Sequence, residues 1–159
     1  TRVEQFLNEA LFSLRAYIHT MNRKDFTFGQ LRDEVNDLLS TTLRSAGYDT
    51  GMDFQANSNS TINPELYRDI KLCMYEIMTN TIRHAAGDRF TVKLREDHGM
   101  LYLSTCDNGQ LTDMAQMQDR GNGARNLIKR ARRHQGDVQF AVCSGGHGLQ
   151  ITMTMTLRN

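Results

Sequence analysis

The segment 64–85, PELYRDIKLCMYEIMTNTIRHA, decides how the rest of the sequence is interpreted. An asparagine precedes it and a proline opens it, which is a strong start signal for a helix. Residues four apart lie on one face of a helix, and Glu76, Asn80 and His84 have this spacing. The segment therefore predicts a long helix that carries a carboxylate, a carboxamide and an imidazole in one row.

Two glycine-containing segments follow the predicted helix. Asp107 and Gly109 stand where a strand is predicted to end, and Gly121 and Gly123 flank the start of another predicted helix. A carboxylate at the first place can accept a hydrogen bond from an exocyclic amine such as that of adenine, and the glycine lets the backbone come close to the base. Small residues at the second place let phosphate oxygens reach the unpaired amides of the helix.

The helix motif and the two glycine-containing segments, in this order, predict a binding site for ATP. Magnesium prefers hard oxygen ligands, and the carboxamide of Asn80 offers a carbonyl oxygen without adding negative charge beside a triphosphate. Glu76 can hold a metal-bound water or accept a proton, and Arg83 or His84 can face the phosphates. Taken alone, each motif has an ordinary structural explanation. The row on the helix can be a solvent-exposed face, the Asp-Asn-Gly segment can be a turn, and the two glycines can be a flexible hinge. Their order and spacing favour a nucleotide site.

The remaining sequence alternates between helical and strand patterns. Residues 107–122 have no periodic pattern, which is typical of a functional loop such as a lid. Strands joined by hairpins indicate a mixed, largely antiparallel sheet with helices over one face, which is a two-layer α/β sandwich. Helices are expected at 2–21, 30–45, 64–85 and 123–134, and strands at 48–55, 90–95, 101–105, 138–142 and 149–157.

Composition bounds the class of protein. The chain has 159 residues, which suits one globular domain, and a net charge of +1, which gives no overall field for nucleic acid or an anionic membrane. No stretch approaches the ~18 to 20 apolar residues of a membrane span, and we recognise no secretory signal. Cys73, Cys106 and Cys143 lie far apart within apolar runs, so we expect buried free thiols in a reducing compartment.

The motifs resemble those of one ATPase superfamily. Glu76-x-x-x-Asn80-x-x-x-His84-Ala85 resembles the N box of the GHKL ATPases, which include sensor histidine kinases, type II topoisomerases, mismatch-repair ATPases and chaperones. Asp107-Asn108-Gly109 resembles the G1 box. The run from Gly121 to Leu127, GNGARNL, followed by Arg130-Ala131, is similar to the G2 box of a histidine kinase branch that includes nitrate and temperature sensors.

The resemblance implies a Bergerat-type sandwich that binds Mg-ATP between its helices and a mobile lid. Asn80 would ligate magnesium and, with Glu76, take part in catalysis. Asp107 would bind the adenine amino group, and Gly109 would line the base pocket. The remaining contacts with the nucleotide or the lid would come from Arg83, His84, Gly121 and Gly123.

The resemblance also implies partners. Residues 1–46 would be the remnant of a dimerisation and phosphotransfer domain with its linker, and residues 47–159 the ATP-binding catalytic domain. In such kinases the γ-phosphate passes to a histidine on a separate helical domain and then to an aspartate of a response regulator. We expect a homodimer through the N-terminal helices, a cytoplasmic location, no nucleic acid partner, and contact with the membrane only through parts outside this chain.

Departures from the family pattern leave alternatives open. Leu111 stands where the G1 box has a second glycine, and Ala124 replaces the usual leucine of the G2 box. His19 lacks the acidic neighbour of the acceptor motif, so we expect the acceptor histidine upstream of Thr1 in a longer protein, or a different substrate. The alternatives are an anti-sigma-factor type serine kinase and a pseudokinase that binds nucleotide or a partner and transfers nothing.

Overall fold

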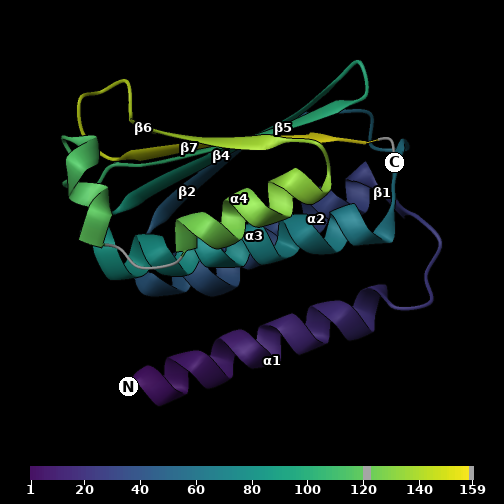
Figure 1. Cartoon of the computed structure of the whole chain (residues 1–159), viewed down its shortest axis with the longest axis horizontal. Helices are drawn as coiled ribbons and strands as arrows, with labels where there is room; N and C mark the ends of the chain where they lie inside the picture. The colour runs from purple at the N-terminus through teal and green to yellow at the C-terminus, as the bar shows by residue number, and fades with distance from the viewer. Residues whose placement is uncertain (120–122, 158–159) are drawn as a thin grey trace.

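The computed structural model describes residues 1–119 and 123–157 as a two-layer sandwich with one helix lying outside it (Figure 1). The sheet layer consists of β2 (Asp49–Gln55), β4 (Arg89–Asp97), β5 (Met100–Asp107), β6 (Asp137–Val142) and β7 (Leu149–Thr156). Its order is β2-β4-β5-β7-β6; β2 pairs with β4 in parallel, and the other described pairs are antiparallel. The predicted two-layer α/β sandwich with a mixed, largely antiparallel sheet is confirmed.

Alternating side chains give the sheet one buried face. The four apolar residues of β7 from Leu149 to Met155 are buried, and the polar residues between them are half-buried. β4 and β5 alternate in the same way and are joined by the predicted turn, where His98 and Gly99 have φ angles of 50° and 79°. The left-handed conformation of both residues matches a two-residue hairpin turn. The buried face is therefore continuous across the hairpin and β7.

The central helix of the second layer is α3 (Pro64–His84). Asn63 caps it as predicted, because its side-chain oxygen accepts a hydrogen bond of 2.8 Å from the backbone N–H of Leu66. α4 (Gly123–Arg133) lies beside α3 over the same face of the sheet (Figure 1). α3 ends at His84, one residue before the predicted end at Ala85, and Ala86 takes a left-handed conformation with a φ of 54°.

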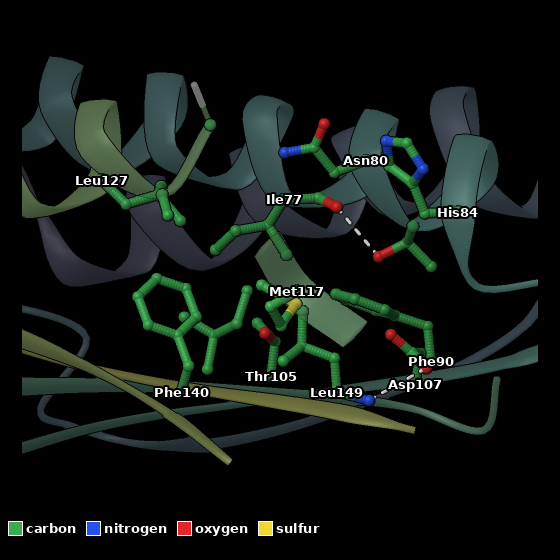
Figure 2. Close-up of a pocket in the computed structure, with 14 residues that line it drawn as sticks. Ile77, Asn80, His84, Phe90, Thr105, Asp107, Met117, Leu127, Phe140 and Leu149 are labelled. Carbon is green, nitrogen blue, oxygen red and sulfur yellow. Dashed lines mark hydrogen bonds between the residues drawn. The ribbon is translucent and has the colours of Figure 1, made fainter. Parts of the chain in front are cut away.

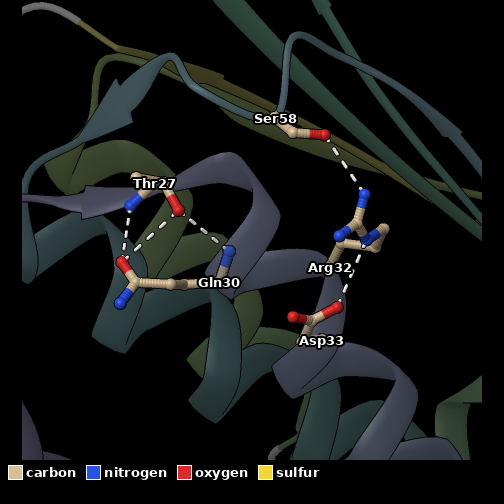
Figure 3. Close-up of polar contacts among 5 residues, drawn as sticks. All are labelled: Thr27, Gln30, Arg32, Asp33 and Ser58. Carbon is tan, nitrogen blue, oxygen red and sulfur yellow. Dashed lines mark hydrogen bonds and ion pairs between the residues drawn. The ribbon is translucent and has the colours of Figure 1, made fainter.

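A capping box starts α2 (Phe28–Leu38) about two residues earlier than predicted. Thr27 Oγ1 accepts a hydrogen bond of 3.0 Å from the Gln30 N–H, and the Gln30 side chain accepts one of 2.8 Å from the Thr27 N–H (Figure 3). The chain continues through the π-helical η1 (Leu39–Leu43) and the 3-10 helix η2 (Arg44–Ala46). Gly47 ends it with a φ of 92°, as predicted.

Two short strands lie beside the start of α2. β1 (Phe26–Thr27) and β3 (Thr61–Ile62) pair in antiparallel fashion. The sequence predicted polar connections there, because a strand of two residues is too short to show alternation. Arg32 of α2 donates a hydrogen bond of 3.1 Å to Ser58 and so fastens the loop before β3 to the helix (Figure 3).

The helix outside the sandwich is α1 (Arg2–Thr20), and it contacts α3 (Figure 1). Phe12 stacks on Tyr75 with ring centroids 4.0 Å apart, and Arg83 donates to Glu9 at 3.3 Å. Most of the large apolar side chains of this helix face solvent. The exposed apolar residues are Val3, Phe6, Leu7, Leu11, Leu14, Tyr17, Ile18 and Met21.

Core packing groups α2 with the sheet. Leu31, Val35 and Leu39 are fully buried and belong to the same hydrophobic cluster as the inner face of the strands. Phe12 of α1 also packs against this cluster, and the boundary between residues 46 and 47 stays a prediction. No described helix is both long enough and apolar enough to cross a membrane.

Candidate functional site

A pocket opens between α3, α4 and the buried face of the sheet (Figure 2). The empty space between its walls is about 560 Å³, a figure that includes space open to solvent. Asn80 and His84 line it from the helix layer, and Asp107 lines it from β5. The walls between them are mostly apolar: Ile77, Phe90, Met117, Leu127, Phe140, Leu149 and Ile151.

Asn80 and Glu76 meet the first residue of α4. They lie one turn apart on α3, and Gly123 is buried directly against both of them. A Cβ atom at Gly123 would lie 2.5 Å from Asn80 Nδ2 and 2.9 Å from Glu76 Oε1, so a larger residue would displace both side chains. This end of the pocket therefore combines a carboxamide, a carboxylate and the N-terminal end of a helix, whose dipole favours negative charge.

Backbone amides hold Asp107 at the opposite end of the pocket. Its Oδ1 accepts hydrogen bonds of 2.8 Å from the Gly109 N–H and 3.2 Å from the Leu149 N–H. Within the described part of the chain, its Oδ2 accepts no hydrogen bond. The side chain is 7% exposed and lines the pocket, so Oδ2 is an acceptor available to a ligand among apolar walls.

The pocket brings together four residues predicted from the sequence: Asn80, His84, Asp107 and Gly123. Glu76 does not line it, but lies at its edge against Gly123. The structure thus places Asn80 and His84 across one cavity from Asp107.

The other predicted site residues lie elsewhere. Arg83 does not line the pocket, because it points toward α1 and pairs with Glu9 at 3.3 Å. Gly109 lies behind the pocket wall, packed so closely on the backbone of Ala85 that a side chain would overlap the Ala85 carbonyl. Gly121 and the end of the predicted lid fall outside the described residues, and the described part of that stretch contains the 3-10 helix η3 (Met114–Asp119).

Sequence reasoning missed the walls of the pocket. Phe90, Phe140 and Leu149 have the alternation of ordinary core residues, and nothing in their type distinguishes a cavity wall from a filled core. Thr105 was also missed, although a signal was available. It stands two residues before Asp107 on β5, and the period of two along a strand places both side chains on the same face.

The cysteine prediction was wrong for one pair. Cys106 and Cys143 form a disulfide, with Cα atoms 6.3 Å apart and a separation of 37 positions in sequence. Their proximity depends on the β5-β7-β6 order, which sequence spacing does not reveal. Cys73 is free and buried, as predicted.

Burial shifts the pKa of two groups behind the pocket. Burial in the middle of α3 raises the pKa of the Cys73 thiol to about 12, against the opposing effect of the Arg130 guanidinium. Burial also raises the pKa of Tyr48, and the negative charge of Asp107 adds to this shift. Both groups are therefore uncharged near neutral pH.

Comparisons of sequence lead to one class of protein. No model of a known protein family matches the chain. The sensor histidine kinase YxjM of Bacillus subtilis (strain 168) is 25% identical over 149 residues, which are 94% of this chain and 35% of YxjM. The sensor protein VraS of Staphylococcus haemolyticus (strain JCSC1435) is 26% identical over 133 residues, which are 81% of this chain and 36% of VraS. The chain thus spans about a third of the length of these relatives.

Solved structures share the fold. Acinetobacter baumannii histidine kinase AdeS matches with a TM-score of 0.68 at 16% identity, over 98% of this chain and 80% of AdeS. The catalytic domain of histidine kinase ThkA matches with a TM-score of 0.68 at 15% identity, over 86% of this chain and 98% of that domain. The chain has the fold of histidine kinase catalytic domains, and these two relatives in sequence are a sensor histidine kinase and a sensor protein, in agreement with the resemblance to the GHKL motifs.

Proposed function

We propose that this chain is the ATP-binding catalytic part of a sensor histidine kinase. It binds Mg-ATP and transfers the γ-phosphate to a histidine outside the chain. The observation that supports this most is the shared pocket, in which Asn80 of α3 and Asp107 of β5 line opposite ends of one cavity. Apolar walls between two polar ends suit a planar base at one end and phosphates at the other.

The Gly123 end of the pocket fits a hydrated magnesium ion. Asn80 would hold the ion through its carbonyl oxygen, and Glu76 adds a carboxylate at the same point because both side chains abut Gly123. When bound, magnesium would neutralise charge on the phosphate oxygens. Glu76 would order a water or accept the proton of the attacking imidazole, and His84 would face the phosphates. The N-terminal amides of α4 favour the same anionic groups.

The Asp107 end fits the edge of adenine. The base carries an exocyclic amino group, which is a donor, and Asp107 Oδ2 is an acceptor held in place through the two hydrogen bonds to Oδ1. Ile77, Phe90 and Leu149 supply apolar contact for the faces of the ring. Gly109 would keep the backbone of the loop close enough for this contact, since it packs directly on Ala85.

The exposed stripe of α1 supports a homodimer as part of the proposal. Phe6 and Ile18 are 69% and 59% exposed, and a continuous apolar stripe of this kind marks an interaction surface. A second copy of the chain would cover it in the full protein. The phosphate would then pass to an aspartate of a response regulator, and we place the chain in the cytoplasm, where Mg-ATP is available.

Titration with a fluorescent ATP analogue tests the nucleotide site. We expect saturable binding that tightens when Mg²⁺ replaces EDTA and that weakens in Asn80→Asp. Asn36→Asp is the matched control, because Asn36 is exposed on α2, and it should bind like the parent chain. Absence of saturable binding in the folded parent chain would refute the proposal.

Phosphotransfer is tested separately with the full protein and γ-labelled ATP. An acid-labile phosphohistidine is the expected product. Acid-stable phosphoserine would instead support the serine kinase alternative. Nucleotide binding without any transfer would support the pseudokinase alternative.

A further inference from the structure

Two cysteines lie at the Asp107 end of the pocket. Cys106 directly precedes Asp107 at the end of β5, and Cys143 directly follows β6. β7 runs between these two strands, so the disulfide crosses the start of β7 near Gly148. The Cα separation of 6.3 Å lies within the range that a disulfide requires.

The segment that follows Cys143 forms hydrogen bonds with Asp107 at the end of β5 and with the loop after it. Leu149 N–H donates to Asp107 Oδ1 at 3.2 Å, and Gly148 N–H donates to the Leu111 carbonyl at 2.8 Å. Cys143 Sγ lies 3.4 Å from the carbonyl oxygen of Asp107. The bond between the two cysteines thus joins the two pieces of chain whose relative position fixes the base-recognising carboxylate.

The pair differs from the third cysteine in accessibility. Cys106 is partly exposed, and the alternation along β5 places it on the face opposite the buried Thr105 and Asp107, whereas Cys73 is fully buried in the core. Small thiols and disulfides can therefore reach Cys106 in the folded protein. In a compartment buffered by thiols, disulfides are usually transient and serve redox sensing or catalysis.

We propose that Cys106 and Cys143 are a reversible thiol–disulfide pair that couples nucleotide affinity to the redox state of the surrounding thiol pool. This inference rests on the proposed nucleotide site. In this proposal the disulfide form, in which Asp107 lines the pocket, is the one that binds nucleotide more tightly.

The reaction partner is a low-molecular-weight disulfide, RSSR. The thiolate of Cys106 attacks one sulfur of RSSR, forms a mixed disulfide and releases RS⁻. Cys143 then attacks the Cys106 sulfur of the mixed disulfide and displaces the second RS⁻. The two cysteines lose two protons and two electrons, RSSR gains both, and the products are the protein disulfide and two RSH. Excess RSH reverses both steps.

Reduction should loosen the carboxylate without unfolding the sheet. The two sulfur atoms must separate from bonding to van der Waals contact. The hydrogen bonds of Gly148 and Leu149, and the contact of His147 Nδ1 with the Gly109 carbonyl oxygen at 3.0 Å, then hold the two segments together. We expect the reduced form to bind Mg-ATP about five-fold more weakly, at the lower end of typical coupling between two sites.

The test compares the chain after treatment with oxidised glutathione and after treatment with dithiothreitol. Alkylation under denaturing conditions and mass spectrometry should find one modified cysteine in the oxidised form and three in the reduced form. The fluorescent ATP analogue should bind the oxidised form about five-fold more tightly. Cys106→Ser and Cys143→Ser should each abolish this difference, and the control Cys73→Ala should retain it.

Three results would overturn the inference, and they are distinguishable. If the disulfide does not form in excess oxidised glutathione, Cys106 and Cys143 are not a reversible thiol–disulfide pair. If the verified oxidised and reduced forms bind the nucleotide with equal affinity, the redox state of the pair is not coupled to nucleotide binding. Absence of nucleotide binding in both forms refutes the proposed function and the coupling together, while the count of alkylated cysteines still reports on the pair. If one of the two serine variants does not fold, the other is used, because replacing either cysteine is enough to prevent the disulfide.

Discussion

Replacing Asp107 with asparagine tests the adenine end of the pocket with the smallest possible change. The side chain keeps its size, and one oxygen must still accept from the Gly109 and Leu149 N–H groups, at 2.8 and 3.2 Å. Those two donors force the amide oxygen of Asn into the position of Oδ1, because an NH₂ group there would face two other donors. The NH₂ group must therefore take the position of Oδ2, which is the position available to a ligand.

The expected loss follows from this orientation. An acceptor toward adenine becomes a donor, so the mutant loses a hydrogen bond to a charged group, worth about 1.5 to 3 kcal/mol. That corresponds to roughly a 10- to 150-fold weaker affinity for ATP. Guanine carries a carbonyl oxygen where adenine carries the amino group, so GTP affinity should stay equal or rise. Stability should fall by only about 1 kcal/mol, since both backbone hydrogen bonds are retained.

Competition titrations with ATP and GTP against the fluorescent analogue measure this prediction directly. Asp53→Asn is the matched control, because Asp53 is exposed on the edge strand β2 and does not line the pocket, and it should leave both affinities unchanged. Thermal unfolding verifies that the mutant is folded. An Asp107→Asn variant that is folded and binds ATP as the parent chain does would refute the assigned role of this carboxylate.

Three further outcomes are expected. Asn80→Asp should weaken Mg-ATP binding by about 10-fold, because it adds a negative charge beside the triphosphate, and calorimetry against Asn36→Asp checks this. Gly123→Ala should weaken Mg-ATP binding by up to about 100-fold, because its Cβ would displace Asn80 and Glu76; Gly145→Ala, where a Cβ would meet no atom within 4 Å, should bind normally. Burial raises the pKa of Cys73 from 9.0 to about 12, so its contribution to stability is complete below about pH 9 and is lost as the pH rises toward 12. Urea unfolding should therefore show a steeper loss of stability over this interval in the parent chain than in Cys73→Ala, and parallel curves would contradict this.

The long helix and the strands could be predicted because their signals are local. An asparagine cap, a proline in the first turn and a four-residue spacing are sufficient to place Glu76 and Asn80 on one face of α3. The alternation along β7 likewise predicts which side chains are buried. In each case the backbone period alone determines the direction of a side chain, without knowledge of its neighbours.

The parts that could not be predicted depend on neighbours in space. Arg83 and His84 are adjacent on a helix and point in different directions, so only one of them can face a pocket on one side of the helix. In the structure His84 lines the pocket, and Arg83 pairs with Glu9 of α1. The Cys106–Cys143 contact requires the order of three strands. The pocket walls use the same residue types as a solid core, so composition cannot identify the cavity.

The parallel pairing of β2 and β4 has a kinetic consequence. The antiparallel neighbours β4 and β5 are joined by a two-residue turn, and such hairpins form within microseconds. β2 can join β4 only after α3, which lies between them in sequence, has crossed the sheet, and this closure of a long segment is slow. β2 is also an edge strand, with a neighbour on one side only among the described strands. During refolding, the unpaired edge of β4 is therefore the surface through which two incomplete chains would associate.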